Sequence, residues 1–160
     1  MSDYEIVPLR DGHRDWAGSL IEDHWGSAVV VTRGRAHDAP RLPGFVAIKD
    51  GEPAGLATYR IEGAECELVT LDSLSPRLGI GTALVRAVAA AAGAAGCERL
   101  WLITTNDNLP AVGFYQGLGF HIAAIHLDAL EVSRGLKPEI PLTGVDGIPI
   151  TDEIELELSL

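Results

Sequence analysis

The sequence predicts an α/β fold in which helices pack on a mixed β-sheet. A helical pattern that begins with two glycines lies between two apolar, strand-like runs, residues 65–75 and 99–104. The order strand, helix, strand implies a right-handed crossover between parallel strands. Asp50 and Gly51 are typical of a tight hairpin turn, which predicts an antiparallel part. The closing residues, 152–160, alternate apolar and acidic side chains, as a half-buried strand near a sheet edge does.

The first part of the chain is expected to supply a helix and the antiparallel strands. A β-branched run suggests the short strand that follows the helix, and glycine and proline then indicate a loop. In chain order, the expected elements are a strand at 4–9, a helix at 11–25, a short strand at 27–32, a loop at 34–44 and two strands at 45–61 around the hairpin turn.

The second part contains the crossover and two later elements. Gly96 is placed to end the crossover helix, and Asn108 and Pro110 are placed to begin the next one. The expected elements are the crossover helix from about residue 80 to 95, a helix at 109–119, a strand at 120–125, a connection at 128–150 with one helical turn, and the closing strand.

Composition limits the classes of function. The chain has 160 residues, enough for one domain spanning 1–160, and its net charge of -11 argues against nucleic-acid or anionic-membrane partners. Its start lacks the layout of a secretory signal, and its longest bland stretch, 83–96, is too short to span a bilayer. Cys66 and Cys97 have no metal-ligand spacing, so they are predicted to be buried thiols. These features favour a cytoplasmic protein without a metal site.

The paired glycines Gly79 and Gly81 lie in the stretch LSPRLGIGTALV, residues 74–85, at the start of the crossover helix. A P-loop is excluded because the segment lacks lysine, and a dinucleotide motif is weak because the third glycine is missing. Two readings remain open at this point. Backbone N–H groups there could hold a pyrophosphate, or the glycines could serve the turn and the close packing of the helix.

A second motif matches a sequence pattern known from a protein family. The segment NDNLPAVGFYQGLGF, residues 106–120, fits the pattern N-x-x-A-x-x-x-Y-x-x-x-G-F. Together with the upstream GIG, it resembles the GNAT superfamily of acyl-CoA-dependent N-acetyltransferases over residues 44–127. The residues that carry this pattern are Asn108, Ala111, Tyr115, Gly119 and Phe120.

The resemblance implies a central mixed sheet of six to seven strands, flanked by helices and splayed where acyl-CoA binds. It also implies acetyl-CoA as co-substrate, with its pyrophosphate on the glycine loop and its pantetheine arm along the second motif. The family usually has Gln or Arg at the position of Pro76, which puts the loop geometry in question, although Arg77 follows. The cofactor-binding residues that it implies are Leu74, Ser75, Arg77, Leu78, Gly79, Ile80, Gly81, Thr82, Asn108, Ala111 and Tyr115.

The same resemblance assigns catalytic roles. Tyr115 is the proton donor to the leaving thiolate, and a backbone N–H near Leu74 or Ser75 faces the thioester carbonyl. Without the family, Tyr115 reads as a packed aromatic residue, and Asn108 has a second role as a helix N-cap.

Glu67 ranks first as the base that takes the proton of the amine. Glu65 and Asp72 remain alternatives, and strict strand alternation places Asp72 on the opposite face from Glu67.

The predicted function is transfer of an acetyl group to a primary amine of a small molecule or a peptide. The alternative is an inactive module that only binds acyl-CoA, and a homodimer is among the partners that the family implies. The excess of acidic residues suggests an acidic vestibule that attracts a cationic, polyamine-like acceptor. Its expected residues are Glu65, Glu67, Asp72, Asp152, Glu153 and Glu155.

Overall fold

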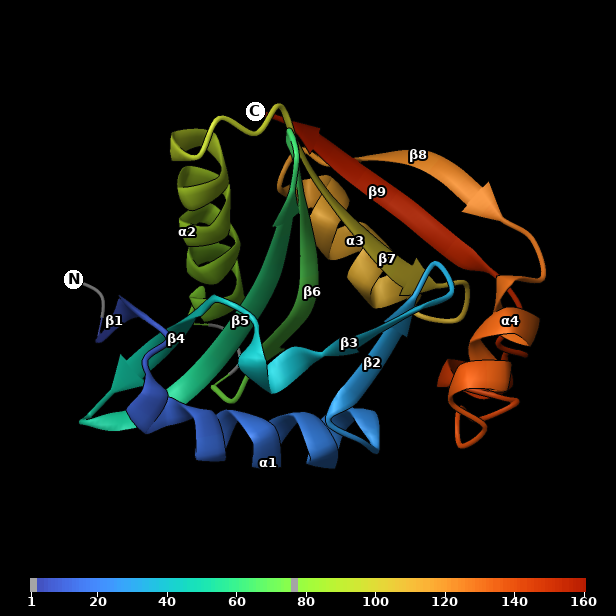
Figure 1. Ribbon diagram of the computed structural model, residues 1–160, viewed down its shortest axis with the longest axis horizontal. Coiled ribbons are helices and arrows are strands. Elements are labelled where there is room, and N and C mark those ends of the chain that lie inside the picture. The colour runs from blue at the N-terminus through green and yellow to red at the C-terminus, as the bar shows by residue number, and fades with distance from the viewer. Residues whose placement is uncertain (1–2, 76–77) are drawn as a thin grey trace.

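The computed structural model describes residues 3–75 and 78–160. A seven-stranded mixed sheet runs through the molecule in the order β1–β4–β5–β6–β7–β9–β8 (Figure 1). Its strands are β1 (Tyr4–Pro8), β4 (Gly44–Lys49), β5 (Glu52–Glu62), β6 (Glu65–Ser73), β7 (Arg99–Thr105), β8 (His121–His126) and β9 (Glu153–Ser159). The pair β6–β7 is parallel and the other neighbours are antiparallel. The expected mixed sheet is therefore confirmed.

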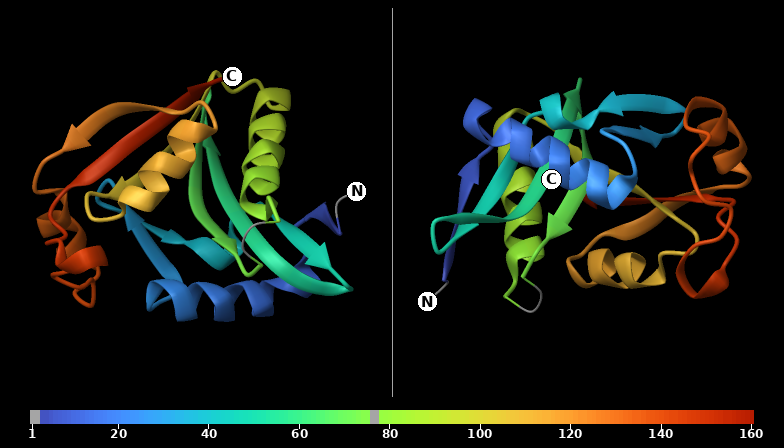
Figure 2. Two further views of the ribbon diagram at one scale, coloured as in Figure 1. Left: turned by 180° about the vertical axis from the view of Figure 1, so that it is seen from behind. Right: turned by 90° about the horizontal axis from the view of Figure 1, so that it is seen from below.

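Helices cover both faces of the sheet. On one face lie α1 (Arg14–Trp25) and a separate hairpin of β2 (Val29–Thr32) and β3 (Arg35–Asp38). On the other lie α2 (Ile80–Ala94) and α3 (Leu109–Gly117), as the view from below in Figure 2 shows. The helix α4 (Ala129–Leu136) stands beyond the end of the sheet, next to β2. Within the residues described, no helix combines the length and apolarity that a membrane crossing requires.

The start of α2 is fixed by close packing on β5. A Cβ atom added to Gly55 would lie 2.7 Å from Ile80 Cγ2 and 3.1 Å from Leu84 Cδ1. Ile80 and Leu84 are fully buried there, and burial of each such side chain contributes about 1.5–3 kcal/mol. A larger residue at position 55 would push the helix off the sheet, so Gly55 positions the N-terminus of α2.

The strands β6 and β7 pair over only part of their length. Residues 65–68 pair with residues 99–102, and beyond that point the strands diverge (Figure 1). The divergence begins at a β-bulge, because Thr58 pairs with Thr70 and Tyr59 pairs with Leu68, which leaves Val69 without a partner on β5. A bulge bends its strand and increases the local twist. The bulge therefore opens a gap between two strands in the middle of the sheet.

Local signals located most elements correctly. Asp50 and Gly51 have the left-handed φ values of 53° and 79° that a two-residue hairpin needs. Gly96 has φ 87° just beyond α2, and the Asn108 side chain accepts a hydrogen bond from the Ala111 N–H at 3.4 Å as the N-cap of α3. These turn and capping predictions are confirmed.

The prediction of a loop at 34–44 is wrong. Arg33 and Gly34 have φ values of 50° and 70°, which reverse the chain and let Arg35–Asp38 pair with β2 as β3. Of the four residues of β3, only His37 is buried, so no apolar alternation marks this strand. The connection at 128–150 also contains more helix than the single turn expected, because α4 spans 129–136.

Candidate active site

Three cavities follow one another across the gap between β6 and β7. The helix cavity, of about 360 Å³, lies at the N-terminus of α2, and the strand-gap cavity, of about 120 Å³, lies between the diverging strands. The hairpin cavity, of about 450 Å³, opens beside the β2–β3 hairpin. Leu71 lines the first two cavities. The last two share Trp25, Ile103, Thr104 and Asn108. The three cavities therefore adjoin one another in a row through the sheet.

The helix cavity presents backbone donors. Gly79 adopts φ 75° as the N-cap of α2, and the helical hydrogen bonds begin with the Ala83 N–H on the Gly79 carbonyl at 3.0 Å. The N–H groups of residues 79–82 therefore have no partner within the helix. Gly79, Ile80, Gly81 and Thr82 all line this cavity, together with Ser75. Amides without partners within the helix, at the positive end of the helix dipole, suit an anion.

The other predicted loop residues have different positions. Ile80 directs its side chain into the core, so it can offer the cavity only its backbone. Leu78 is exposed at 39%. Arg77, predicted to bind the cofactor, lies outside the described residues, as does Pro76.

The backbone of β6 offers donors to the strand gap, but not at Leu74. The Leu74 N–H donates to the Ala54 carbonyl at 2.8 Å, so the prediction that it faces a bound carbonyl group is wrong. Antiparallel pairing alternates the direction of N–H groups along a strand. The N–H groups of Leu71 and Ser73 consequently point away from β5, toward the gap.

Tyr115 closes the strand-gap cavity from α3. Its side chain is 8% exposed and makes edge contacts with the rings of Phe114 and Phe120, at centroid distances of 5.1 and 5.5 Å. Burial, and then the nearby Asp72 carboxylate, raise the pKa of its hydroxyl, which stays protonated at neutral pH. Ala111 lines the same cavity, and Asn108 lies where it meets the hairpin cavity. The second sequence motif therefore forms one wall of the gap.

Glu67 is a buried carboxyl group whose pKa lies near neutrality. Its side chain is 5% exposed, and Oε2 accepts a hydrogen bond from Thr32 Oγ1 at 2.6 Å. Burial raises the pKa of Glu67 to about 7, although the Thr32 hydrogen bond and two arginines, Arg60 and Arg35, act in the opposite direction. A carboxyl with this pKa can accept and release a proton at physiological pH.

His37 completes this buried group. Its Nε2 lies 2.8 Å from Thr32 Oγ1 and 3.7 Å from Glu67 Oε1. Burial, and then the charges of Arg35 and Arg60, lower the pKa of His37 to about 4, so the ring is neutral and its contact with Glu67 is not an ion pair. Sequence reasoning missed Thr32 and His37, because they come from the hairpin whose second strand carries no apolar pattern.

Asp72 lies on the same face of the sheet as Glu67, so its predicted placement on the opposite face is wrong. The unpaired Val69 shifts the alternation of β6 by one residue. The Asp72 carboxylate is held by α1, with Oδ1 2.7 Å from Nδ1 of His24.

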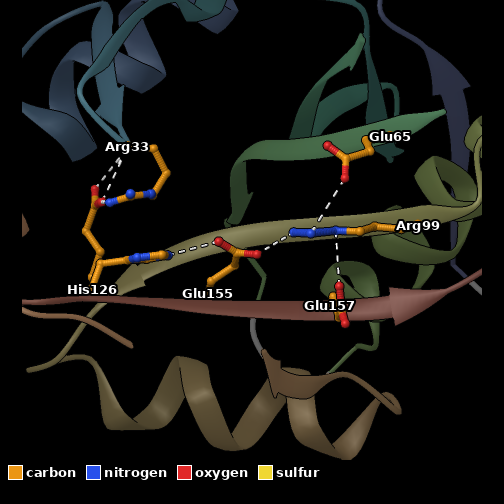
Figure 3. A network of polar contacts seen from close by, with 7 residues as sticks. Arg33, Glu65, Arg99, His126, Glu155 and Glu157 are labelled. Carbon is orange, nitrogen blue, oxygen red and sulfur yellow. Dashed lines mark hydrogen bonds and ion pairs between the residues drawn. The ribbon is translucent and has the colours of Figure 1, made fainter. Parts of the chain in front are cut away.

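The expected acidic vestibule stays a prediction, because its residues lie in several groups with polar partners and one of them, Glu153, lines the hairpin cavity. Figure 3 shows Arg99 between Glu65, Glu155 and Glu157, at N–O distances of 3.7, 2.5 and 3.1 Å. Glu153 is buried and accepts hydrogen bonds from the backbone and side chain of Arg33. The remaining acids of the expected set also have hydrogen-bond partners, which are Thr32 for Glu67, His24 for Asp72 and the Asp128 N–H for Asp152.

The hairpin cavity is mainly apolar. Its apolar lining includes Trp25, Val30, Ile103, Leu130 and Ile140. Lys137 reaches it from the end of α4, donating from Nζ to the carbonyls of Trp25 and Val29 at 2.7 and 2.9 Å. These contacts tie α4 to α1 and β2 and hold the cavity closed on that side. Sequence reasoning predicts only one helical turn in this connection and therefore missed the contribution of α4.

The described part of the chain gives no support for a catalytic cysteine or a metal-binding site. Cys66 and Cys97 are buried free thiols, and burial raises the pKa of Cys66 to about 12, which makes it a poor nucleophile. Within residues 3–75 and 78–160, no group of three or more His, Cys, Asp or Glu side chains is placed to hold a metal ion.

Comparison with known proteins finds relatives along nearly the whole chain. A sequence model of the Acetyltransferase (GNAT) family matches residues 9–120. The uncharacterized Bacillus subtilis proteins YdhI and YxbD are 41% and 36% identical to this chain. The alignments cover 93% and 94% of this chain, and 94% and 96% of those proteins. A solved GNAT family acetyltransferase from Elizabethkingia anophelis with acetyl-CoA bound shares the fold, with a TM-score of 0.72, 19% identity and full coverage of both chains.

Glu67→Gln tests whether burial destabilises the ionised carboxyl. Because the folded-state pKa is raised from 4.5 to about 7, the stabilising contribution of Glu67 is present below pH 4.5 and is lost as the pH rises through 7. Gln does not ionise, so the variant should gain stability relative to the wild type between pH 5 and pH 8, by on the order of 2 kcal/mol. Urea unfolding of both proteins at the two pH values measures this gain. A stability difference that stays constant would show that Glu67 ionises as freely when folded as when unfolded.

Proposed function

The chain belongs to the GNAT family of acetyltransferases, and from this premise we propose that it transfers an acetyl group from acetyl-CoA to a primary amine of a small molecule. The observation that carries the proposal is the course of three adjoining cavities through the sheet. Such a course lets the donor enter from the α2 side and the acceptor from the hairpin side. Thr32 and Tyr115 line these cavities and Glu67 lies behind Thr32 at hydrogen-bond distance, which favours catalysis over binding alone.

Acetyl-CoA is the donor in this proposal. Its pyrophosphate is bound by the amides of residues 79–82, and the missing side chains of Gly79 and Gly81 let it approach. Its pantetheine arm extends between β6 and β7, where the Leu71 and Ser73 N–H groups can hydrogen-bond to its amide groups and to the thioester oxygen. Asn108 and Ala111 flank it from α3.

The acceptor occupies the hairpin cavity. A volume of about 450 Å³ suits a small molecule, and the largely apolar lining suits one with an apolar body. The amine reaches the thioester where the hairpin and strand-gap cavities meet, beside Trp25, Ile103 and Thr104. A mainly apolar lining favours an acceptor with an apolar body over a polycation, although Glu139 and Glu153 also line the cavity.

The transfer proceeds directly. The amine loses a proton to the Glu67 carboxylate and forms its bond to the thioester carbonyl carbon, while backbone N–H groups stabilise the oxyanion. The carbon–sulfur bond then breaks, and the Tyr115 hydroxyl donates to the departing thiolate. Because the pKa of Tyr115 is raised, complete proton transfer to a thiolate with a pKa of about 8.5 is uphill, and the hydroxyl acts mainly as a hydrogen-bond donor.

Gly81→Val tests the phosphate position. A Cβ at residue 81 lies 3.4 Å from Phe114 Cζ, so the variant can fold, but the added methyl groups fill the helix cavity. We expect the acetyl-CoA Kd to rise by at least about tenfold in calorimetric titration. Gly93→Val is the matched control in the same helix, because a Cβ there has no described atom within 4 Å. An unchanged acetyl-CoA affinity in the folded Gly81→Val variant would show that the pyrophosphate does not bind at this position.

Tyr115→Phe tests the donor to the thiolate. The ring and its aromatic contacts remain, so acetyl-CoA binding should persist, while kcat should fall within the general-acid range of about 10²–10⁴-fold. Because the raised pKa of Tyr115 limits proton transfer, the fall in kcat should lie near the lower end of that range. Tyr59→Phe removes the hydroxyl of a partly buried tyrosine that lines none of the three cavities in the described structure and should leave kcat unchanged. Wild-type kcat in Tyr115→Phe would mean that another group assists the thiolate.

A panel of amines tests the proposed function itself. Thiol release from acetyl-CoA is followed with primary amines of matched size that carry apolar, anionic or polycationic bodies. We expect a higher kcat/KM with primary amines of apolar body than with the anionic or polycationic amines, because the hairpin cavity is mainly apolar. Tight acetyl-CoA binding without thiol release on any amine would instead support a module that only binds acyl-CoA.

A further inference from the structure

We propose that the hydroxyl of Thr32 is the group that passes the proton of the acceptor amine to Glu67, and that His37 positions this hydroxyl. The inference rests on the proposed acetyl transfer and adds to it a contact that lies outside both sequence motifs. Thr32 belongs to β2, in the small hairpin that stands apart from the main sheet.

The first argument is access. In the part of the chain that the structure describes, Glu67 is absent from the lining of all three cavities, whereas Thr32 lines the hairpin cavity. The Thr32 hydroxyl lies 2.6 Å from Glu67 Oε2, so it separates the buried carboxyl from the space that the acceptor occupies. An amine in that cavity meets the hydroxyl before it can meet the carboxylate.

The second argument is the count of hydrogen-bonding positions. A threonine hydroxyl has one proton to donate and two lone pairs. When Glu67 is ionised, the Thr32 proton points to Oε2, and His37, 2.8 Å away, must donate its Nε2–H to one lone pair. The neutral state of His37 is consistent with this tautomer. One lone pair of Thr32 is left to accept an N–H from the acceptor.

The proton transfer that follows is balanced. The N–H bond of the attacking amine breaks as its proton moves to Thr32 Oγ1, and the original Thr32 O–H bond breaks as that proton moves to Glu67 Oε2. The net result is a neutral Thr32, a protonated Glu67 and a nitrogen that has lost one proton. Glu67 returns the proton to water after the product leaves.

Charged groups around the carboxyl set the pH range of this step. Arg60 on β5 and Arg35 on β3 favour the ionised form of Glu67, and Glu153 on β9 opposes it. His37 faces the carboxyl from β3 without a charge at neutral pH. Because the pKa of Glu67 is about 7, kcat/KM should rise with pH through 7 when the amine of the acceptor titrates well away from that value.

Thr32→Val and Thr32→Ser form the test, with Thr143→Val as an exposed control. Valine keeps the shape and removes the hydroxyl, so we expect kcat to fall by about 10²-fold or more while the acetyl-CoA Kd stays unchanged. The rise of kcat/KM with pH around 7, the limb near pH 7, should disappear. Serine keeps the hydroxyl and should retain kcat within about tenfold of the wild type, together with the limb. If Thr32→Val fails to fold, Thr32→Cys against Thr32→Ser makes the same comparison, because a thiol is a weak donor of similar shape.

The role of His37 has its own comparison. His37→Gln keeps an N–H donor for Thr32 and should retain the limb near pH 7, whereas His37→Leu should lose most of kcat with little change in KM.

Wild-type kcat and an intact limb in Thr32→Val, with thiol release still measurable in the wild type, would overturn the relay and leave the proposed function standing. Equal losses in the valine and serine variants would also overturn it, because they would mark packing and not the hydroxyl as the cause. Absence of thiol release by the wild type on every amine would overturn the proposed function and the relay together.

Discussion

The pairing of β6 with β7 stops after Leu68 and Leu102, and the arrangement of the site follows from where it stops. The cause is the bulge at Val69, which bends β6 away from its parallel neighbour. The bend opens the gap in which Tyr115 and Asn108 lie, and it leaves the N–H groups of Leu71 and Ser73 without a partner on β7. The same bulge brings Glu67 and Asp72 to one face of the sheet. One extra residue in one strand therefore creates the opening and supplies its donors.

Two further constraints complete the site around this gap. Gly55 lets α2 approach β5 closely, which brings the amides of its first turn beside the end of β6. On the opposite face, the hairpin of β2 and β3 covers Glu67 and removes it from water. A buried carboxyl with a pKa near 7 lowers the stability of the folded state at neutral pH, and a base poised at physiological pH needs that same shift. The hairpin therefore lowers the stability of the folded protein at neutral pH and gives Glu67 a pKa suited to proton transfer.

Much of the fold could be predicted from the sequence because its signals are local. The Asp50-Gly51 turn, the glycine that ends α2 and the Asn108 cap each depend on a few neighbouring residues. The bulge could not be predicted, since Val69 is typical of a regular strand and its exclusion from the ladder depends on β5. Strand β3 was missed for a related reason, because three of its four residues are exposed. The partners of the acidic residues could not be predicted either, because Arg99 and Arg33, distant in sequence, reach Glu155 and Glu153 only in the folded chain.

Amide hydrogen exchange of the intact protein, with and without acetyl-CoA, tests the central claim most directly, because it reports on single N–H groups of the gap. If the donor lies between the diverging strands, acetyl-CoA should slow exchange at Leu71 and Ser73 as well as at residues 79–82, while Leu74, already bonded to Ala54, should change little. Saturating acetyl-CoA that leaves exchange at Leu71 and Ser73 unaltered would contradict the claim that the opening made by the Val69 bulge holds the donor.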